Sequence, residues 1–271
     1  MRYPTILFFI ALLSLLSCKQ KIEKAPHTAA VDQVESAVDR KGAEAQKEGQ
    51  KSSHNDLDFL IREPKIKQEK IPCLFLLHGL GSNEKDLLRI GQRMDDRLMV
   101  VSLQGPYSFN NMKDKYSWYP LQLRNGNYNY DFEMAKSSKN KILKIVKQLS
   151  AQYNLDEENI FIGGFSQGGV MSLYTALSTN DIFRGAISFS GYLPAEAKSE
   201  ILKSPRDPDL EIFASHGTSD KKVEFVRAEI TMKFIDSLKV KNTFYADNAR
   251  HTVSPDHFAN FDQWISDILD N

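Results

Sequence analysis

The chain has 271 residues, more than a single domain of about 200 to 220 residues needs, so it has room for an extension beside one core. Hydrophobic residues make up 41% and charged residues 26%, as in ordinary globular proteins, and 35 basic residues balance 35 acidic ones. The lack of a basic excess argues against a nucleic-acid partner, and two cysteines are too few for a disulfide framework.

The N-terminus has the pattern of a signal peptide. A weakly basic start precedes an apolar run, Ile6 to Leu16, that is short for a membrane span. The run ends in Leu15-Leu16-Ser17-Cys18, which resembles the lipobox of bacterial lipoproteins, where the cysteine becomes the lipidated first residue. The alternative is an ordinary secretory signal in which Cys18 is incidental. We expect residues 1–17 to be a signal peptide and Cys18 to carry a lipid anchor to a membrane.

Residues 18–53 are rich in Lys, Glu, Gln, Ala and Ser and poor in large apolar side chains. Such a segment cannot bury enough surface to offset its ordering entropy, so it is predicted to be a disordered tether. The folded domain is then expected over residues 54–271. No Asp follows Cys18, which is compatible with an exported lipoprotein of the bacterial outer membrane, on its periplasmic or surface face.

From about Leu57 the sequence alternates between apolar strand patterns and helical periodicity. The predicted strands are Leu57–Arg62, Ile71–Leu77, Leu98–Leu103, Asn159–Gly163, Arg184–Phe189, Leu210–Ser215 and Asn242–Tyr245. The predicted helices are Glu84–Arg93, Phe132–Tyr153, Gln167–Leu177, Val223–Leu238 and Asp256–Leu269. A long loop rich in Asn, Tyr and Gly is expected up to about Asn129. The alternation predicts an α/β fold with a mostly parallel central sheet and helices on both faces.

Gly164-Phe165-Ser166-Gln167-Gly168 lies between a predicted strand and a predicted helix. This is the nucleophile-elbow pattern, in which a serine occupies a sharp turn that exposes its hydroxyl. Side chains two residues before and after the serine would collide, so glycines are needed there. The turn also directs the N–H of Gln167 toward a forming oxyanion, where the helix dipole is favourable. We therefore expect Ser166 to be a nucleophile and Gln167 to donate to the oxyanion.

His78-Gly79-Leu80-Gly81 follows the predicted strand Ile71–Leu77 directly. In α/β-hydrolases the second oxyanion donor comes from the loop after this strand, and glycines let the backbone approach the substrate. We assign that donor to the N–H of Leu80. The His78 side chain is predicted to be part of the scaffold, held by local hydrogen bonds.

An acidic residue and a general base should follow the serine along the chain. Asp220 ends the segment His216-Gly217-Thr218-Ser219-Asp220 after a predicted strand, and its alternative role is to cap the next helix. Asp207 and Asp247 fit the acidic position less well. For the base we choose His251, which follows the last predicted strand after a short loop.

His257 is the other choice for the base, but it lies at the start of the last predicted helix, where its side chain is expected to face solvent or to cap. In the preferred arrangement Asp220 holds the tautomer of His251, and His251 accepts the proton of Ser166.

Taken together, these residues resemble the phospholipase/carboxylesterase family of small α/β-hydrolases, which includes acyl-protein thioesterases. The matching segments are residues 78–81, 163–169, 216–220 and 251–255. The resemblance extends from about Leu57 to Ile268 and implies an α/β-hydrolase fold with no large lid. It also makes Trp118 and Tyr119 possible walls of a substrate pocket. One departure is the stretch Asn248 to Arg250, where members usually have a glycine-rich turn.

The expected activity is hydrolysis of carboxylic esters or thioesters, small or lipid-like, through an acyl-enzyme on Ser166. An alternative is an esterase for feruloyl or acetyl groups on polysaccharides, since the aromatic loop before Tyr130 could stack on such substrates. A third hypothesis is a non-catalytic, surface-binding lipoprotein, although such a protein would not need a complete triad. No cofactor is expected, and the sequence has no His, Cys and carboxylate spacing typical of a metal site.

Overall fold

The computed structural model describes residues 57–124, 127–205 and 207–271. The predicted signal peptide, lipidated Cys18 and tether of residues 18–53 lie outside the described residues, as do the first residues of the predicted domain. Within the described ranges, no helix is both long enough and apolar enough to cross a membrane.

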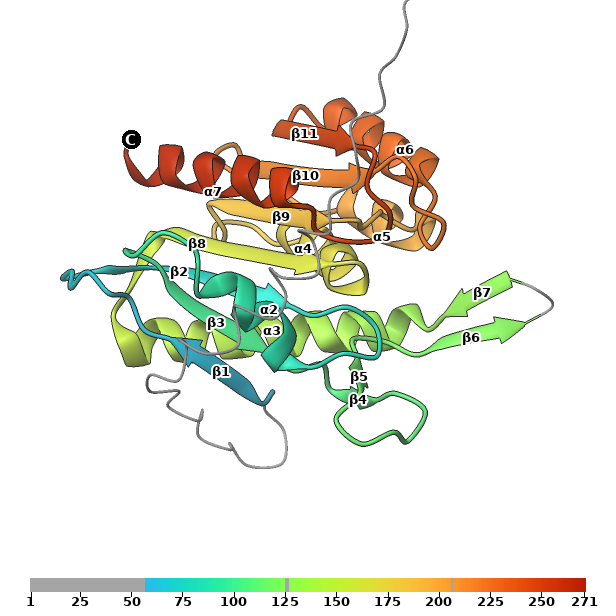
Figure 1. Ribbon diagram of the computed structural model, residues 1–271, viewed down its shortest axis with the longest axis horizontal. Coiled ribbons are helices and arrows are strands. Elements are labelled where there is room, and N and C mark those ends of the chain that lie inside the picture. Colours follow the sequence, from blue (N-terminus) through green and yellow to red (C-terminus); the bar gives the residue numbers. More distant parts are fainter. Residues whose placement is uncertain (1–56, 125–126, 206) are drawn as a thin grey trace, which may run out of the picture. The chain divides into compact units, whose positions relative to one another are not determined.

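Seven strands form one sheet in the order β1-β3-β2-β8-β9-β10-β11 (Figure 1). Only β1 runs antiparallel to its neighbour β3, and all the other neighbouring pairs are parallel. The strands are β1 (Phe59–Arg62), β2 (Ile71–Leu77), β3 (Met99–Leu103), β8 (Leu155–Phe165), β9 (Gly185–Phe189), β10 (Glu211–Gly217) and β11 (Lys241–Asp247). The predicted fold class, an α/β fold with a mostly parallel sheet, is confirmed.

Helices cover both faces of this sheet, because side chains of the buried strands point alternately to either side. Along β2, Leu74 and Leu76 join the apolar cluster that includes residues of α2 and α7, whereas Phe75 and Leu77 join the cluster that includes residues of the other helices. The first face carries α2 (Glu84–Gly91) and α7 (Pro255–Leu269); the second carries α3 (Phe132–Tyr153), α4 (Gln167–Leu177), α5 (Ala195–Ile201) and α6 (Phe225–Ser237).

The segment predicted as one long loop contains two short hairpins instead. They are β4 (Tyr107–Ser108) with β5 (Tyr116–Ser117), and β6 (Leu121–Arg124) with β7 (Asn127–Tyr130). Figure 1 shows the second hairpin projecting past the end of the sheet where β8 and β10 finish. The strands are only two to four residues long, too short for the hydrophobic pattern that marks the sheet strands to be recognised in their sequence.

Helix α5 was also not predicted, because seven residues are too few to display helical periodicity. Its Ala197 and Ile201 are buried against the core. At the other extreme, every residue of α4 is buried. The helix that begins beside Ser166 is therefore held on all sides by the protein.

Candidate active site

Ser166 is the single residue between β8 and α4. Its backbone has φ 53° and ψ −113°, a conformation that costs a non-glycine residue on the order of 1–3 kcal/mol. The Ser166 N–H donates to the carbonyl oxygen of Phe189 at 2.8 Å, which fixes the turn to the neighbouring strand β9. The strained conformation is thus stabilised by the sheet and by the buried helix that follows.

The glycines around Ser166 are required by backbone contacts. A Cβ atom on Gly168 would lie 1.9 Å from the carbonyl oxygen of Leu77, and one on Gly164 would lie 2.4 Å from the carbonyl carbon of Gly168. No side chain fits at either position. The end of β2 and the turn at Ser166 are therefore in direct backbone contact.

The structure brings Ser166, His251 and Asp220 together at the carboxyl ends of β8, β11 and β10. The Ser166 hydroxyl lies 2.9 Å from His251 Nε2, and His251 Nδ1 lies 2.6 Å from Asp220 Oδ2. Because a carboxylate only accepts hydrogen bonds, Nδ1 carries the proton and Nε2 is free to accept one from the hydroxyl. The Asp220 side chain is fully buried, whereas His251 keeps 10% of its surface exposed.

The carboxylate of Asp220 also accepts hydrogen bonds from the backbone that follows it. The N–H groups of Lys222 and Val223 donate to Asp220 Oδ1 at 2.8 and 3.0 Å. Burial by itself would raise the pKa of this carboxyl, but the hydrogen bonds from His251, Val223 and Lys222 outweigh it and hold the pKa below its ordinary value. The group is therefore a carboxylate at neutral pH that both caps the following turn and contacts His251.

His216 is a neighbour of this site that the sequence reasoning did not single out. Its Nε2 donates to the carbonyl oxygen of Val223 at 2.8 Å and lies 3.3 Å from Asp220 Oδ2. The ring is buried, and burial lowers its pKa, so it is neutral behind the carboxylate. The sequence feature that could have singled out His216 is its place in a His-Gly pair after the mostly apolar residues 210–215.

The two predicted oxyanion donors have no hydrogen-bond acceptor among the residues that the structure describes. The Leu80 N–H makes no hydrogen bond to any described residue, while the adjacent Gly81 N–H donates to Tyr116 at 2.8 Å. Gln167 is the first residue of α4, so its N–H has no intrahelical acceptor. Gly81 adopts φ +74°, which a glycine tolerates in this turn.

His78 is a scaffold residue, as its sequence context predicts. Its Nε2 accepts the Gly105 N–H at 2.9 Å, and its Nδ1 donates to the carbonyl oxygen of Gly79 at 2.7 Å. The ring is fully buried, and burial lowers its pKa to about 4 against the opposing effect of the Gly79 hydrogen bond. His78 is therefore neutral and ties the loop containing Leu80 to the strand β3 side of the sheet.

The stability of the folded protein should fall in mild acid because of His78. In the unfolded chain the pKa of the imidazole is near 6.5, whereas in the folded protein it is about 4. Between these values the unfolded state binds more protons, so stability is lost as the pH falls through this window, by at most about 3 kcal/mol. Urea unfolding at about pH 7.5 and about pH 4.5 measures this loss. The variant His78→Asn should lose less on acidification, and an equal loss in both proteins would contradict the prediction.

The side chain of Gln167 joins the turn at Ser166 to the segment that precedes the hairpin β6–β7. Its Oε1 accepts the Trp118 N–H at 2.9 Å, and its Nε2 donates to the carbonyl oxygen of Tyr119 at 2.8 Å. The Trp118 indole in turn donates to the carbonyl oxygen of His78 at 2.9 Å and is fully buried. Trp118 thus lies packed beside the loop after β2, where it supports that loop.

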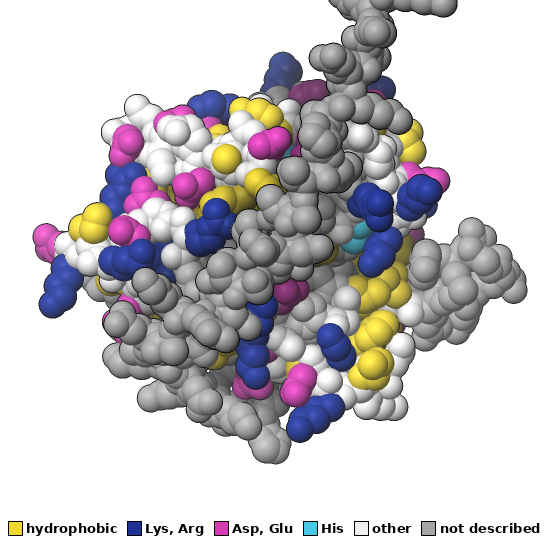
Figure 2. Space-filling model, in the orientation of Figure 1, with side chains coloured by type: hydrophobic (Ala, Val, Ile, Leu, Met, Phe, Trp, Pro, Cys, Tyr) yellow, Lys and Arg dark blue, Asp and Glu magenta, His cyan; other side chains and the backbone are white. Residues whose placement is uncertain are grey.

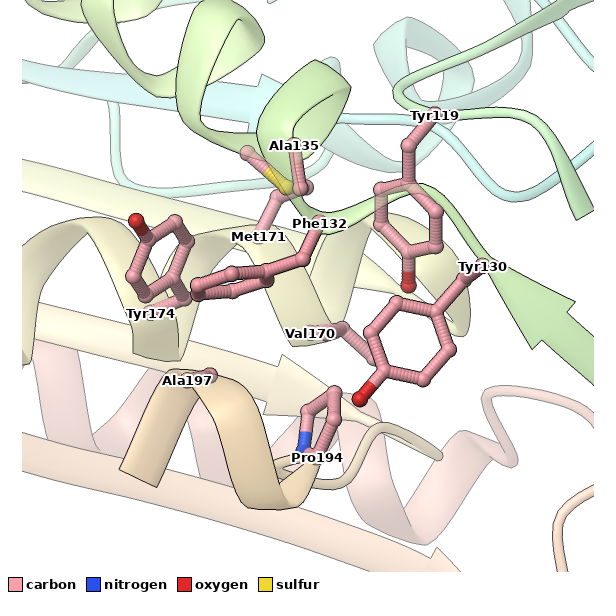
Figure 3. Close-up of a pocket in the computed structure, with 9 residues that line it drawn as sticks. All are labelled: Tyr119, Tyr130, Phe132, Ala135, Val170, Met171, Tyr174, Pro194 and Ala197. Carbon is pink, nitrogen blue, oxygen red and sulfur yellow. The ribbon is translucent and has the colours of Figure 1, made fainter. Parts of the chain in front are cut away.

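Tyr119 lines a small cavity beside α4 (Figure 3). The empty space is about 210 Å³, which includes open solvent at its mouth, so the enclosed part is small. Val170, Met171 and Tyr174 lie on the same face of α4 as Gln167, because residues three and four apart are neighbours on a helix. The remaining lining residues are Tyr130, Phe132, Ala135, Pro194 and Ala197. An apolar cavity, lined in part by aromatic side chains, therefore lies on the face of α4 that begins at Gln167.

The prediction that His257 faces solvent or caps a helix is wrong. Its side chain is buried, and its Nε2 lies 3.2 Å from Asp247 Oδ1. Ser254 caps α7 instead, because its hydroxyl oxygen accepts the backbone N–H of His257 at 3.1 Å. Asp247 is occupied by this contact and by the hydroxyl of Ser254 at 2.6 Å. The burial of His257 could not be predicted from the sequence, because it depends on a contact with Asp247 at the end of β11, ten residues earlier in the chain.

Among the described residues, no group of three or more His, Cys, Asp or Glu side chains is arranged to hold a metal ion. The chemistry that the arrangement offers is that of an activated hydroxyl, a base oriented by a carboxylate, and two free backbone N–H groups.

Comparison with known proteins adds the family to this geometry. The sequence model of the phospholipase/carboxylesterase family matches residues 58–269. The chain belongs to this family. The acyl-protein thioesterase 1 of Yarrowia lipolytica is 30% identical over 206 residues, which cover 72% of this chain and 88% of that protein. The acyl-protein thioesterase 1 of Mycosarcoma maydis is 27% identical over 195 residues, covering 66% of this chain and 81% of that protein.

Solved structures show that this member of the phospholipase/carboxylesterase family shares its fold with other esterases. The crystal structure of esterase PE8 superposes with a TM-score of 0.68 at 24% identity, covering 79% of this chain and 99% of that one. The Bacillus cereus carboxylesterase gives a TM-score of 0.65 at 19% identity, covering 78% and 94% of the two chains. At these identities the likeness concerns the fold.

Proposed function

We propose that Ser166 is the nucleophile with which this carboxylic ester hydrolase cleaves esters or thioesters. The observation that supports this most is the continuous chain of hydrogen bonds from Asp220 through His251 to Ser166, at 2.6 and 2.9 Å. Membership of the phospholipase/carboxylesterase family is consistent with it. A fluorophosphonate probe tests the proposal, since it should label the folded protein covalently on Ser166.

The proposed reaction has two halves. His251 accepts the proton of Ser166 as the hydroxyl oxygen attacks the substrate carbonyl carbon, and the resulting oxyanion is bound by the N–H groups of Leu80 and Gln167. The imidazolium, stabilised by the carboxylate of Asp220, then protonates the departing alcohol or thiol and leaves an acyl-enzyme. In the second half water repeats the attack, and the carboxylic acid departs with Ser166 restored.

The cavity beside α4 is the proposed site for the acyl group. It lies on the same helical face as Gln167, whose N–H would bind the carbonyl oxygen, and its walls are apolar and aromatic. Because its empty volume of about 210 Å³ includes open solvent, the enclosed part is small and suits an acetyl group better than a longer chain. This favours the acetyl form of the polysaccharide-ester alternative over the bulkier feruloyl form.

Short acyl esters should therefore be the better substrates. We expect kcat/KM for p-nitrophenyl acetate and butyrate to exceed that for the palmitate ester by at least about tenfold, because the cavity cannot enclose a long chain. Initial rates on a series of chain lengths, below the micellar concentration of each ester, give this ratio. A preference for palmitate would exclude the cavity as the acyl site.

We also propose that Cys18 is lipidated and anchors the enzyme to the bacterial outer membrane after export. The support is the sequence pattern alone, an apolar run that stops at the cysteine where charged residues begin. More than one acyl chain would give a stable anchor, since a single chain binds only marginally. Mass spectrometry of the membrane fraction tests this: an unmodified Cys18 in a soluble protein would contradict the proposal.

A further inference from the structure

Three exposed basic residues adjoin Asp220 and His251 in the sequence. Lys221 and Lys222 follow Asp220 directly, and Arg250 precedes His251 directly. All three are exposed, and none pairs with a carboxylate of the described residues. Since Asp220 and His251 are in contact, the three residues lie in the two chain segments that this hydrogen bond joins. We call them the cationic rim.

The acidic groups nearest the cationic rim along the chain are occupied elsewhere. Asp220 is buried and bonded to His251, and Asp247 accepts hydrogen bonds from Ser254 and from a backbone N–H. Glu224 lies 3.9 Å from Arg227. The three cations therefore form no ion pair with a described carboxylate, although the chain as a whole has zero formal net charge.

Figure 2 shows Lys and Arg side chains gathered around a histidine on one face of the molecule. Uncompensated charges of one sign at the mouth of a site raise the local concentration of ligands of the opposite sign.

The position of the rim relates it to one part of the substrate. His251 delivers its proton to the departing alcohol or thiol, so the leaving group must lie on the His251 side of Ser166. The acyl group is assigned to the cavity beside α4, whose lining does not include His251. A charge that the rim attracts is therefore carried by the leaving group.

We propose that the cationic rim selects esters and thioesters whose leaving alcohol or thiol carries an anionic group, a carboxylate or a phosphate. This inference rests on the proposed function, because it takes Ser166 and His251 as the reacting residues. It departs from the family resemblance at a definite place, since Arg250 belongs to the stretch where members usually have a glycine-rich turn.

Four acetyl esters of matched shape test this preference. The probes are para-acetoxybenzoate, para-acetoxyphenyl phosphate, the neutral para-acetoxybenzamide and a para-acetoxyphenyl trimethylammonium salt. At about 10 mM salt, where the Debye length is about 30 Å, we expect kcat/KM for one or both anionic esters to exceed that for the amide by about tenfold. The advantage should shrink toward unity near about 1 M salt, where the Debye length is about 3 Å.

Two variants that each lose three positive charges distinguish an effect of the cationic rim from an effect of net charge. The rim variant combines Lys221→Gln, Lys222→Gln and Arg250→Gln, and should lower the ratio of anionic to neutral kcat/KM by about tenfold, the effect of about 1.4 kcal/mol. The control combines substitutions of three other exposed lysines, Lys67→Gln, Lys203→Gln and Lys239→Gln, and should keep the ratio of the parent protein.

Each outcome has a definite meaning. A preference for only one of the two anions supports the proposal and identifies the group. Equal rates on anionic and neutral esters, or a preference for the cationic ester, would overturn the rim while leaving the proposed function intact. An equal loss of preference in the rim variant and the control would also overturn it. No hydrolysis of any ester would overturn the proposed function itself.

Discussion

Replacing Ser166 with alanine is expected to lower kcat by at least about 10³-fold and by as much as about 10⁶-fold on a short p-nitrophenyl ester. In the proposed mechanism the substitution removes the atom that forms the acyl-enzyme, while the proposed oxyanion donors and acyl cavity remain. The residual rate would therefore be the contribution of binding and of the N–H groups of Leu80 and Gln167. Stopped assays with high enzyme concentrations are needed to measure it.

Covalent labelling separates the chemical role of Ser166 from a structural one. The fluorophosphonate label should disappear in Ser166→Ala and persist in Ser199→Ala, which changes an exposed serine of α5. Urea unfolding of the Ser166 variant should show a folded protein, since alanine retains the Cβ atom of the strained turn. Labelling that survives in Ser166→Ala would place the nucleophile elsewhere.

Replacing Asp220 with asparagine should lower kcat by about 10⁴-fold, with the geometry nearly unchanged. The amide is close to the carboxylate in shape, but its NH₂ group would donate to His251 Nδ1 in place of the present hydrogen bond at 2.6 Å. The proton would then sit on Nε2, which could no longer accept the proton of Ser166. A carboxylate that only capped the following turn would give a much smaller effect.

Asp247→Asn is the matched comparison for that experiment. Asp247 also lies at the end of a strand and accepts hydrogen bonds, but from Ser254 and Ala249, not from His251. We expect its kcat to stay within about tenfold of the parent value, since its effect on Ser166 would be indirect. Similar losses in the two variants would contradict the choice of Asp220.

Local patterns predicted the sheet and the turn at Ser166 well. Strand β2 and helices α3 and α4 have the bounds that their apolar periodicity indicates, since both faces of the sheet are buried. The glycines at positions 164 and 168 predicted the close backbone contacts, because a serine in a sharp turn between a strand and a helix leaves no room for side chains two residues before and after it.

Contacts between distant parts of the chain were beyond the sequence. The side chain of Gln167 accepts a hydrogen bond from Trp118, 49 residues earlier, and no pattern in either segment predicts this hydrogen bond. The same holds for His216 behind Asp220, and for the burial of His257 by Asp247. The two hairpins before α3 were missed because their strands of two to four residues are too short to display an alternating pattern.

The contact between Gly168 and the carbonyl oxygen of Leu77 has a consequence for motion. The loop that supplies the Leu80 N–H and the turn that presents Ser166 meet backbone to backbone, without side chains that could adjust between them. Neither can open alone, so both should belong to one cooperative unit of local unfolding. We therefore expect the conformational changes that accommodate different substrates to occur at the proposed borders of the site, which are the cavity beside α4 and the cationic rim.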